Sequence, residues 1–120
     1  MAVKTMVAAY QTSGRYIDRH KVNQRVLVIN SLRDQLLGNI VNVHEEGFML
    51  IGNKVPLTDS GVYQLTFQFL SPVLGRQEIT LGGECLWVRE TSDDQYWAGF
   101  QIIDISDEDK KVVASLCEQI

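Results

Sequence analysis

The stretch from residue 61 to residue 69, GVYQLTFQF, carries the clearest pattern in the chain. Apolar residues occupy every second position, and glutamine or threonine fills the positions between them. The apolar positions are Tyr63, Leu65, Phe67 and Phe69. Because successive side chains of a strand point to opposite faces, this alternation predicts an antiparallel strand with one face on a core and the other in solvent.

Similar short apolar runs, separated by turn residues, lie on both sides of this strand. They are Arg25–Asn30, Gln35–Val43, Gly47–Ile51, Gln77–Arg89 and Tyr96–Ile103. Such closely spaced strands predict a sandwich or a barrel. Gly82 and Gly83 interrupt the longest run and predict a bulge, which reverses the facing of the residues after it. The orientation of Trp87 therefore stays open, although a tryptophan in this setting is more often core than ligand platform.

The period changes after the last strand. Ser106 is a good N-cap, and three carboxylates in the next turn suit the helix dipole. An apolar stripe follows at helical spacing and consists of Val112, Val113, Leu116, Cys117 and Ile120. We therefore expect an all-β fold with a terminal helix, in which six antiparallel strands form a barrel and the helix lies on it, across an open end in the simplest packing.

Composition bounds the class of protein. The chain has 120 residues, with 45% apolar and 22% charged residues, which is ordinary for one globular domain. Its apolar runs are too short to cross a bilayer, and its first ten residues do not resemble a signal peptide. The two cysteines, Cys85 and Cys117, fit no disulfide framework or metal motif, so we expect reduced thiols and a cytoplasmic protein without a bound metal.

Charge divides the chain into a basic arm and an acidic body. Residues 1–25 have a net charge of +4, and residues 26–120 have a net charge of −8. We expect residues 1–24 to form a flexible arm and residues 25–120 to form the barrel with its helix. The arm either meets an anionic partner or docks on its own acidic barrel. An acidic body disfavours long nucleic acids and single-stranded RNA, which need a broad basic surface.

Two short motifs stand out in this frame. Residues 15–19 read RYIDR, which places Arg15 and Arg19 four apart just before the first strand. Residues 42–47 read NVHEEG, with Asn42 and Gly47 around the turn after the second strand. The pair RxxxR, followed by [D/N]xSxxG, resembles the PilZ domains, and residues 85–88 and 98–102 are also similar to the last strands of that family. The resemblance covers roughly residues 14–118.

The resemblance implies a six-stranded barrel with a C-terminal helix that binds cyclic di-GMP rather than an enzyme with a cofactor. It assigns the ligand to Arg15, Arg19, Asn42, His44 and Gly47. The chemistry agrees, because an arginine fork pairs with phosphate oxygens or with guanine O6 and N7, and Asn42 offers both donors and an acceptor. Gly47 allows positive φ and a close approach of the main chain to a ligand. The sequence contains no nucleophile and base that we can assemble into a catalytic site.

Other interpretations of the same residues stay open. The two arginines are either ligand contacts, solvated arm residues or partners of Glu45 and Glu46, and Asn42 either binds or shapes the turn. His44 stands where the family has serine, and its ring either donates to a phosphate or fills the pocket. The competing hypothesis is therefore an adaptor that binds no nucleotide and docks on motility, surface-appendage or polysaccharide machinery. The sequence does not distinguish a monomer from a dimer.

Overall fold

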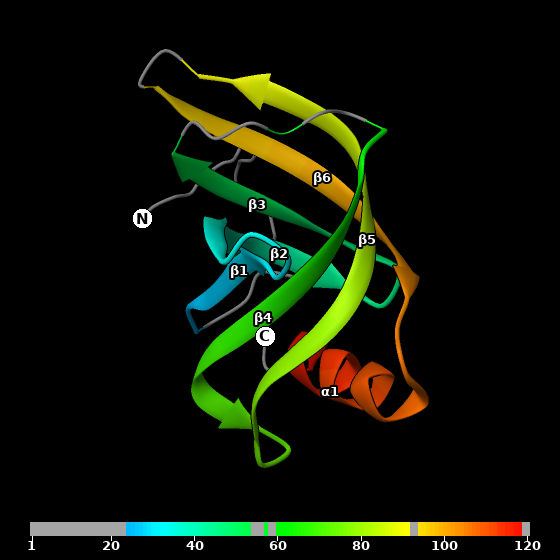
Figure 1. Cartoon of the computed structure of the whole chain (residues 1–120). Helices are drawn as coiled ribbons and strands as arrows, with labels where there is room; N and C mark the ends of the chain where they lie inside the picture. The colour runs from blue at the N-terminus through cyan, green and yellow to red at the C-terminus, as the bar shows by residue number, and fades with distance from the viewer. Residues whose placement is uncertain (1–23, 54–56, 58–59, 92–93, 119–120) are drawn as a thin grey trace.

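Six antiparallel strands and one following helix make up the part of the chain that the computed structural model describes, namely residues 24–53, 57, 60–91 and 94–118 (Figure 1). The elements are β1 (Val26–Asn30), β2 (Gln35–His44), β3 (Gly47–Asn53), β4 (Val62–Val73), β5 (Arg76–Glu90), β6 (Gln95–Asp104) and α1 (Asp107–Cys117). The strands close into a barrel in the order β1-β2-β3-β6-β5-β4. The predicted barrel and terminal helix are confirmed.

The predicted inward face of β4 forms the centre of the core. Leu65, Phe67 and Phe69 are buried, and Tyr63 is half-buried against the same cluster. The Phe48 ring meets the Phe67 ring edge-on at 4.9 Å between centroids and stacks on Phe100 at 5.1 Å. Aromatic rings from β3, β4 and β6 therefore meet inside the barrel, which joins strands that are far apart in the sequence.

Most strand ends lie within two residues of their predicted positions, but β4 runs four residues further than expected. Its pairing with β5 shifts between Gln68 and Val73. The main chain between them is held from the other side, because Leu70 N donates to Arg25 O at 3.2 Å. Pro72 therefore lies in a strand at an irregular position, where a missing N–H costs little.

An irregularity lies at Gly82 and Gly83 as predicted, since the β5–β6 register shifts between them, but the extra residue is Ile103 of β6 and the alternation of β5 continues through the glycine pair. A second shift, which the sequence did not reveal, lies between Cys85 and Trp87 and makes Leu86 the extra residue. Cys85 points into the core, whereas Trp87 lies on the outer surface with 37% of its side chain exposed. The orientation of Trp87, which the sequence left open, is therefore outward and not the more frequent core position.

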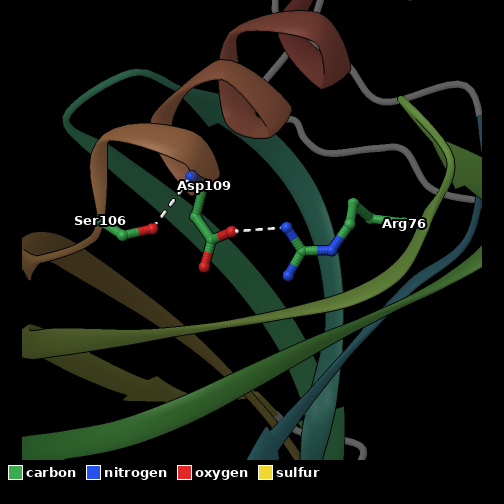
Figure 2. A network of polar contacts seen from close by, with 3 residues as sticks. All are labelled: Arg76, Ser106 and Asp109. Atoms are coloured by element: carbon green, nitrogen blue, oxygen red, sulfur yellow. Dashed lines mark hydrogen bonds and ion pairs between the residues drawn. The ribbon is translucent and has the colours of Figure 1, made fainter.

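The helix α1 packs on β2, β4 and β5 at the end of the barrel where the β4–β5 hairpin turns (Figure 1). Ser106 caps it as predicted, since Ser106 Oγ accepts from Asp109 N at 3.1 Å. The carboxylate of Asp109 also pairs with Arg76 Nη1 of β5 at 3.1 Å (Figure 2). The predicted stripe is buried at Val112, Val113 and Leu116, while Cys117 is partly buried and Ile120 lies outside the described residues. Both cysteines are free thiols.

The phenol of Tyr96 joins β6 to β2 in the core, because it donates to Leu37 O inside the barrel. Burial, with smaller contributions from Cys85 and Tyr63, raises the pKa of Tyr96 above its ordinary value. The folded state therefore keeps a proton that the unfolded state releases, so this stabilisation is complete below about pH 10 and is lost as the pH rises above it. Between pH 8 and pH 11, we expect the free energy of unfolding, measured by urea denaturation, to fall by about 1.4 kcal/mol less in Tyr96→Phe than in the unaltered chain. An equal loss in both proteins would contradict this role.

The β4–β5 hairpin turns through two residues that both have positive φ, Leu74 at 50° and Gly75 at 75°. Val73 and Arg76 pair on either side, so this is a two-residue turn of the type that favours Asn-Gly. Leucine is unfavourable in the left-handed region, whereas asparagine tolerates it. We expect Leu74→Asn to raise the free energy of unfolding by about 0.5–1 kcal/mol, measured by urea denaturation. A lower stability would show that an apolar contact of this leucine in the folded chain outweighs the strain of its backbone.

Candidate functional site

The second motif lies at the tip of the β2–β3 hairpin. His44 pairs with Gly47 across the strands, so the turn itself consists of Glu45 and Glu46 rather than of all four residues. His44 Nδ1 accepts from Glu46 N at 3.2 Å, and Ile102 N of β6 donates to Glu46 O at 2.8 Å. The turn is therefore fixed from its own strand and from the neighbouring one.

Gly47 is required for a reason other than the expected one. Its φ is not positive, which corrects that expectation. A Cβ at this position would lie 2.6 Å from Phe100 O, closer than any side chain tolerates. The same Cβ would lie 3.4 Å from His44 Cε1, so the imidazole ring lies beside the glycine. Glycine thus allows β3 to approach β6 and leaves room for the His44 ring.

Asn42 lies on the outer surface of the barrel next to an irregularity in β2. The β2–β3 register shifts between Ile40 and Asn42, and Asn42 then pairs with Met49. The next residue, Val43, is buried, whereas Asn42 and Met49 are half-buried. The amide of Asn42 is therefore presented on the outside of the sheet, two residues before His44.

Strand register extends this position into a row across four strands. Asn42 of β2 pairs with Met49 of β3, Met49 with Gly99 of β6, and Gly99 with Trp87 of β5. A Cβ on Gly99 would lie 2.3 Å from Trp87 Nε1, so the glycine lets the indole lie directly against the β6 main chain. The guanidinium carbon of Arg89 lies 5.9 Å from the centre of the Trp87 ring. One outer face therefore carries an amide, a thioether and an indole with a neighbouring cation.

The end of α1 lies close to the turn of the second motif. Cys117 Sγ donates to Val43 O at 3.6 Å. Burial raises the pKa of the Cys117 thiol, and the nearby carboxylates of Glu45 and Glu118 raise it further. The thiol therefore stays protonated at neutral pH and acts as a contact between the helix and β2 rather than as a nucleophile.

The segment that joins the arm to the barrel leads into β1, the neighbour of the strand that carries Asn42. Leu27 of β1 pairs with Asn39 of β2, three residues before Asn42, and Arg25 directly precedes β1. Ser71 N of β4 donates to Gln24 Oε1 at 2.9 Å and fixes this point from the other side. Arg15 and Arg19 lie outside the described residues, as do residues 1–23 of the predicted arm, so their place relative to Asn42 stays a prediction.

Comparison with known proteins decides the family. The PilZ domain family matches residues 15–119, a range that includes the barrel, the helix and both motifs. The chain belongs to the PilZ domain family. No curated protein sequence matches it.

The fold of this PilZ domain is also similar to a solved structure, the Bacillus subtilis inhibitor of motility MotI/DgrA. The TM-score is 0.63 at 9% sequence identity, and the match covers 80% of this chain. It covers 46% of MotI/DgrA, so the chain spans less than half of that protein's length. At this identity the likeness concerns the fold alone.

PilZ domains are binding and receptor modules rather than enzymes. Within the described ranges, no three His, Cys, Asp or Glu side chains gather in a way that would hold a metal ion. Among the same residues, no helix is long and apolar enough to cross a bilayer.

Of the five predicted site residues, the structure brings Asn42, His44 and Gly47 together at one end of the β2–β3 hairpin. Sequence reasoning missed the outer row beyond Asn42, namely Met49, Gly99 and Trp87. Gly99 was the available signal, since a glycine between buried Ala98 and Phe100 indicates a close approach on the outer face.

Proposed function

We propose that this PilZ domain is a receptor for cyclic di-GMP, which binds on the outer row of the barrel and is closed in by Arg15 and Arg19. The observation that carries the proposal is the position of Asn42. It opens a row that ends in Trp87 and lies one strand away from the residues where the arm begins. Gln24 is the fifth residue after Arg19, a reach of at most about 17 Å. The arginine pair therefore reaches the row without any change in the barrel.

The side chains in this region suit the ligand. Cyclic di-GMP carries two phosphates and two guanines, and an arginine fork binds either group with two hydrogen bonds. The amide of Asn42 matches the donors and acceptors of a guanine edge. An exposed indole offers a flat apolar surface to a purine. Because the barrel is acidic, the arm supplies the positive charge that a dianion needs.

Calorimetry tests the proposal directly. Titrating cyclic di-GMP into micromolar full-length protein should give saturable heat, and GTP at the same concentration should give none. The fluorescence of Trp87 should change with the same midpoint, because its ring is partly exposed on the proposed surface. A titration without heat or fluorescence change, in a protein with a cooperative unfolding transition, would refute the receptor.

His44 leaves less room for a ligand over Gly47 than the serine of the family motif would. Its ring lies beside Gly47, and its Nδ1 already accepts a hydrogen bond from Glu46 N. Neutral imidazole then has one donor left, at Nε2, and protonation at Nδ1 would break the bond to the turn. We expect His44→Ser to tighten the binding of cyclic di-GMP by about tenfold, since a smaller side chain frees the surface over Gly47.

The control for this variant is Gln68→Ser, a change of an exposed polar residue on β4 that should leave affinity unchanged. Weaker binding by His44→Ser would mean that the imidazole itself contacts the ligand. Both proteins should unfold at the temperature of the unaltered chain.

His44 also favours a second candidate, an adaptor that binds no nucleotide. Its ring occupies the surface beside Gly47, and Glu45 and Glu46 place negative charge at the same tip. This candidate acts through a protein partner in motility, surface-appendage or polysaccharide machinery. The structural neighbour bears the name inhibitor of motility, which makes motility the first process to test. The absence of heat with both the unaltered chain and His44→Ser would favour the adaptor.

Both candidates act in the cytoplasm and without catalysis. For the receptor, we propose that closure of the arm over the ligand changes the surface that a partner protein reads. Such a switch is a shift between two populated states, and the ligand stabilises the closed one.

A further inference from the structure

The tip of the β4–β5 hairpin presents an apolar face to solvent. Leu70 is 76% exposed and Leu74 is 63% exposed, and Pro72 between them is exposed as well. Val73 points the other way and is buried. Leu70, Pro72 and Leu74 are alternate residues at this tip, which lies at the end of the barrel that carries α1 (Figure 1).

Leucine at position 74 is doubly unfavourable for a free surface. It exposes an apolar side chain, and its backbone adopts a φ of 50°. The other described residues with positive φ, glycines aside, are Asp34, Ser60 and Asp94. Those are short polar residues that suit turns. A leucine at such a position has the same unfavourable backbone conformation, and its apolar side chain is poorly solvated. We infer that an apolar segment covers this face.

The hairpin is held firmly enough to receive such a segment. Arg76, next to the turn, pairs with Asp109 at the start of α1 (Figure 2). Val73 anchors the preceding strand in the core. Because the leucine face is already ordered, docking costs little rearrangement of the barrel.

The arm of this same chain begins directly beside the face. Leu70 N donates to Arg25 O, and Ser71 N donates to Gln24 Oε1. The arm also contains an uncharged stretch, Met6–Tyr10, with the sequence MVAAY. Gln24 is the fourteenth residue after Tyr10, and the chain between them spans up to about 48 Å. The leucine face lies within a few residues of Gln24, so the stretch can return to it with ample slack.

We propose that residues 6–10 of the arm dock on the face formed by Leu70, Pro72 and Leu74. The arm is then held at both ends, at Tyr10 and at Gln24, and residues 15–19 form part of the loop between them. Such a tether confines the arginine pair to the neighbourhood of β1, which lies between β4 and β2. The proposal concerns the nucleotide-free chain and does not rest on the receptor function.

Methyl NMR of the nucleotide-free full chain tests the contact. We expect nuclear Overhauser effects between the methyl groups of Met6 or Val7 and those of Leu70 or Leu74, independent of protein concentration. They should disappear in the double variant Leu70→Ser/Leu74→Asn and persist in Leu86→Ser, which alters an exposed leucine elsewhere on β5. The asparagine suits the turn, so the double variant keeps the fold.

Trypsin gives a second readout at Lys4, which lies just before the docked stretch. Cleavage after Lys4 should be about threefold or more faster in the double variant than in Leu86→Ser. Cleavage after Lys110 should be equal in the two. Equal rates at Lys4, together with the absence of the methyl contacts, would overturn the proposal. Contacts seen only between a labelled and an unlabelled molecule would also overturn it and would assign the face to a second copy of the chain.

Discussion

Arg19→Ala is expected to weaken the affinity for cyclic di-GMP by about 30- to 150-fold, a loss of about 2–3 kcal/mol. The guanidinium can pair with a phosphate or with the Hoogsteen edge of a guanine, and alanine leaves that group without a partner. The acidic barrel does not compensate, because residues 26–120 have a net charge of −8. Calorimetry with the full-length variant measures the effect, and Arg15→Ala should lower the affinity in the same direction.

The matched control is Arg33→Ala. Arg33 is an exposed arginine in the β1–β2 turn, at the other end of β1 from the arm. The Arg33→Ala substitution removes one positive charge at a distance from Asn42 and should change the affinity for cyclic di-GMP by less than about twofold. If Arg19→Ala and Arg33→Ala bind with equal affinity, the arginine pair has no direct role and only general electrostatics remains.

Phe48→Ala is expected to cause the largest loss of stability, about 3–5 kcal/mol. The ring is 3% exposed, stacks on Phe100 and meets Phe67 edge-on. Its removal leaves a cavity where β3, β4 and β6 meet. Since a domain of this size is stable by only about 5–15 kcal/mol, the variant should approach the limit of folding.

Urea denaturation measures this loss. The control is Leu86→Ala, which truncates an apolar side chain that is 52% exposed and should cost less than about 0.5 kcal/mol. A small effect of Phe48→Ala would mean that the surrounding rings collapse into the space. That outcome would show in the m-value or in near-ultraviolet circular dichroism.

The alternation in β4 and the N-cap at Ser106 were enough to predict the barrel and the helix, because each signal is local. Core strands with a two-residue period and a helix with an apolar stripe need no knowledge of their neighbours. The sequence also indicated an irregularity at the glycine pair of β5, and the register shifts there, although the extra residue belongs to β6. The extension of β4 through Pro72 was missed, because it depends on a hydrogen bond from Leu70 N to Arg25 O, just before β1.

The site was harder to predict for the same reason. Asn42, His44 and Gly47 are close in the sequence and are found together, and their role in binding stays a prediction. Trp87 could not be oriented, because its facing depends on the register shift at Leu86, which no glycine or proline marks, and not on the glycine pair. The need for glycine at position 47 arises from the Phe100 carbonyl, fifty-three residues later, and no local pattern contains it.

The second shift in β5 has a consequence for how the domain tolerates changes in length. Leu86 sets the phase of the strand as an extra residue, because a regular pairing of Leu86 with Gly99 would turn the indole toward the interior, where Cys85 and Phe100 already fill the volume. Insertions and deletions in the turns leave that phase untouched. In related barrels, the spacing between the glycine pair and the tryptophan should therefore vary less than the length of any connecting loop.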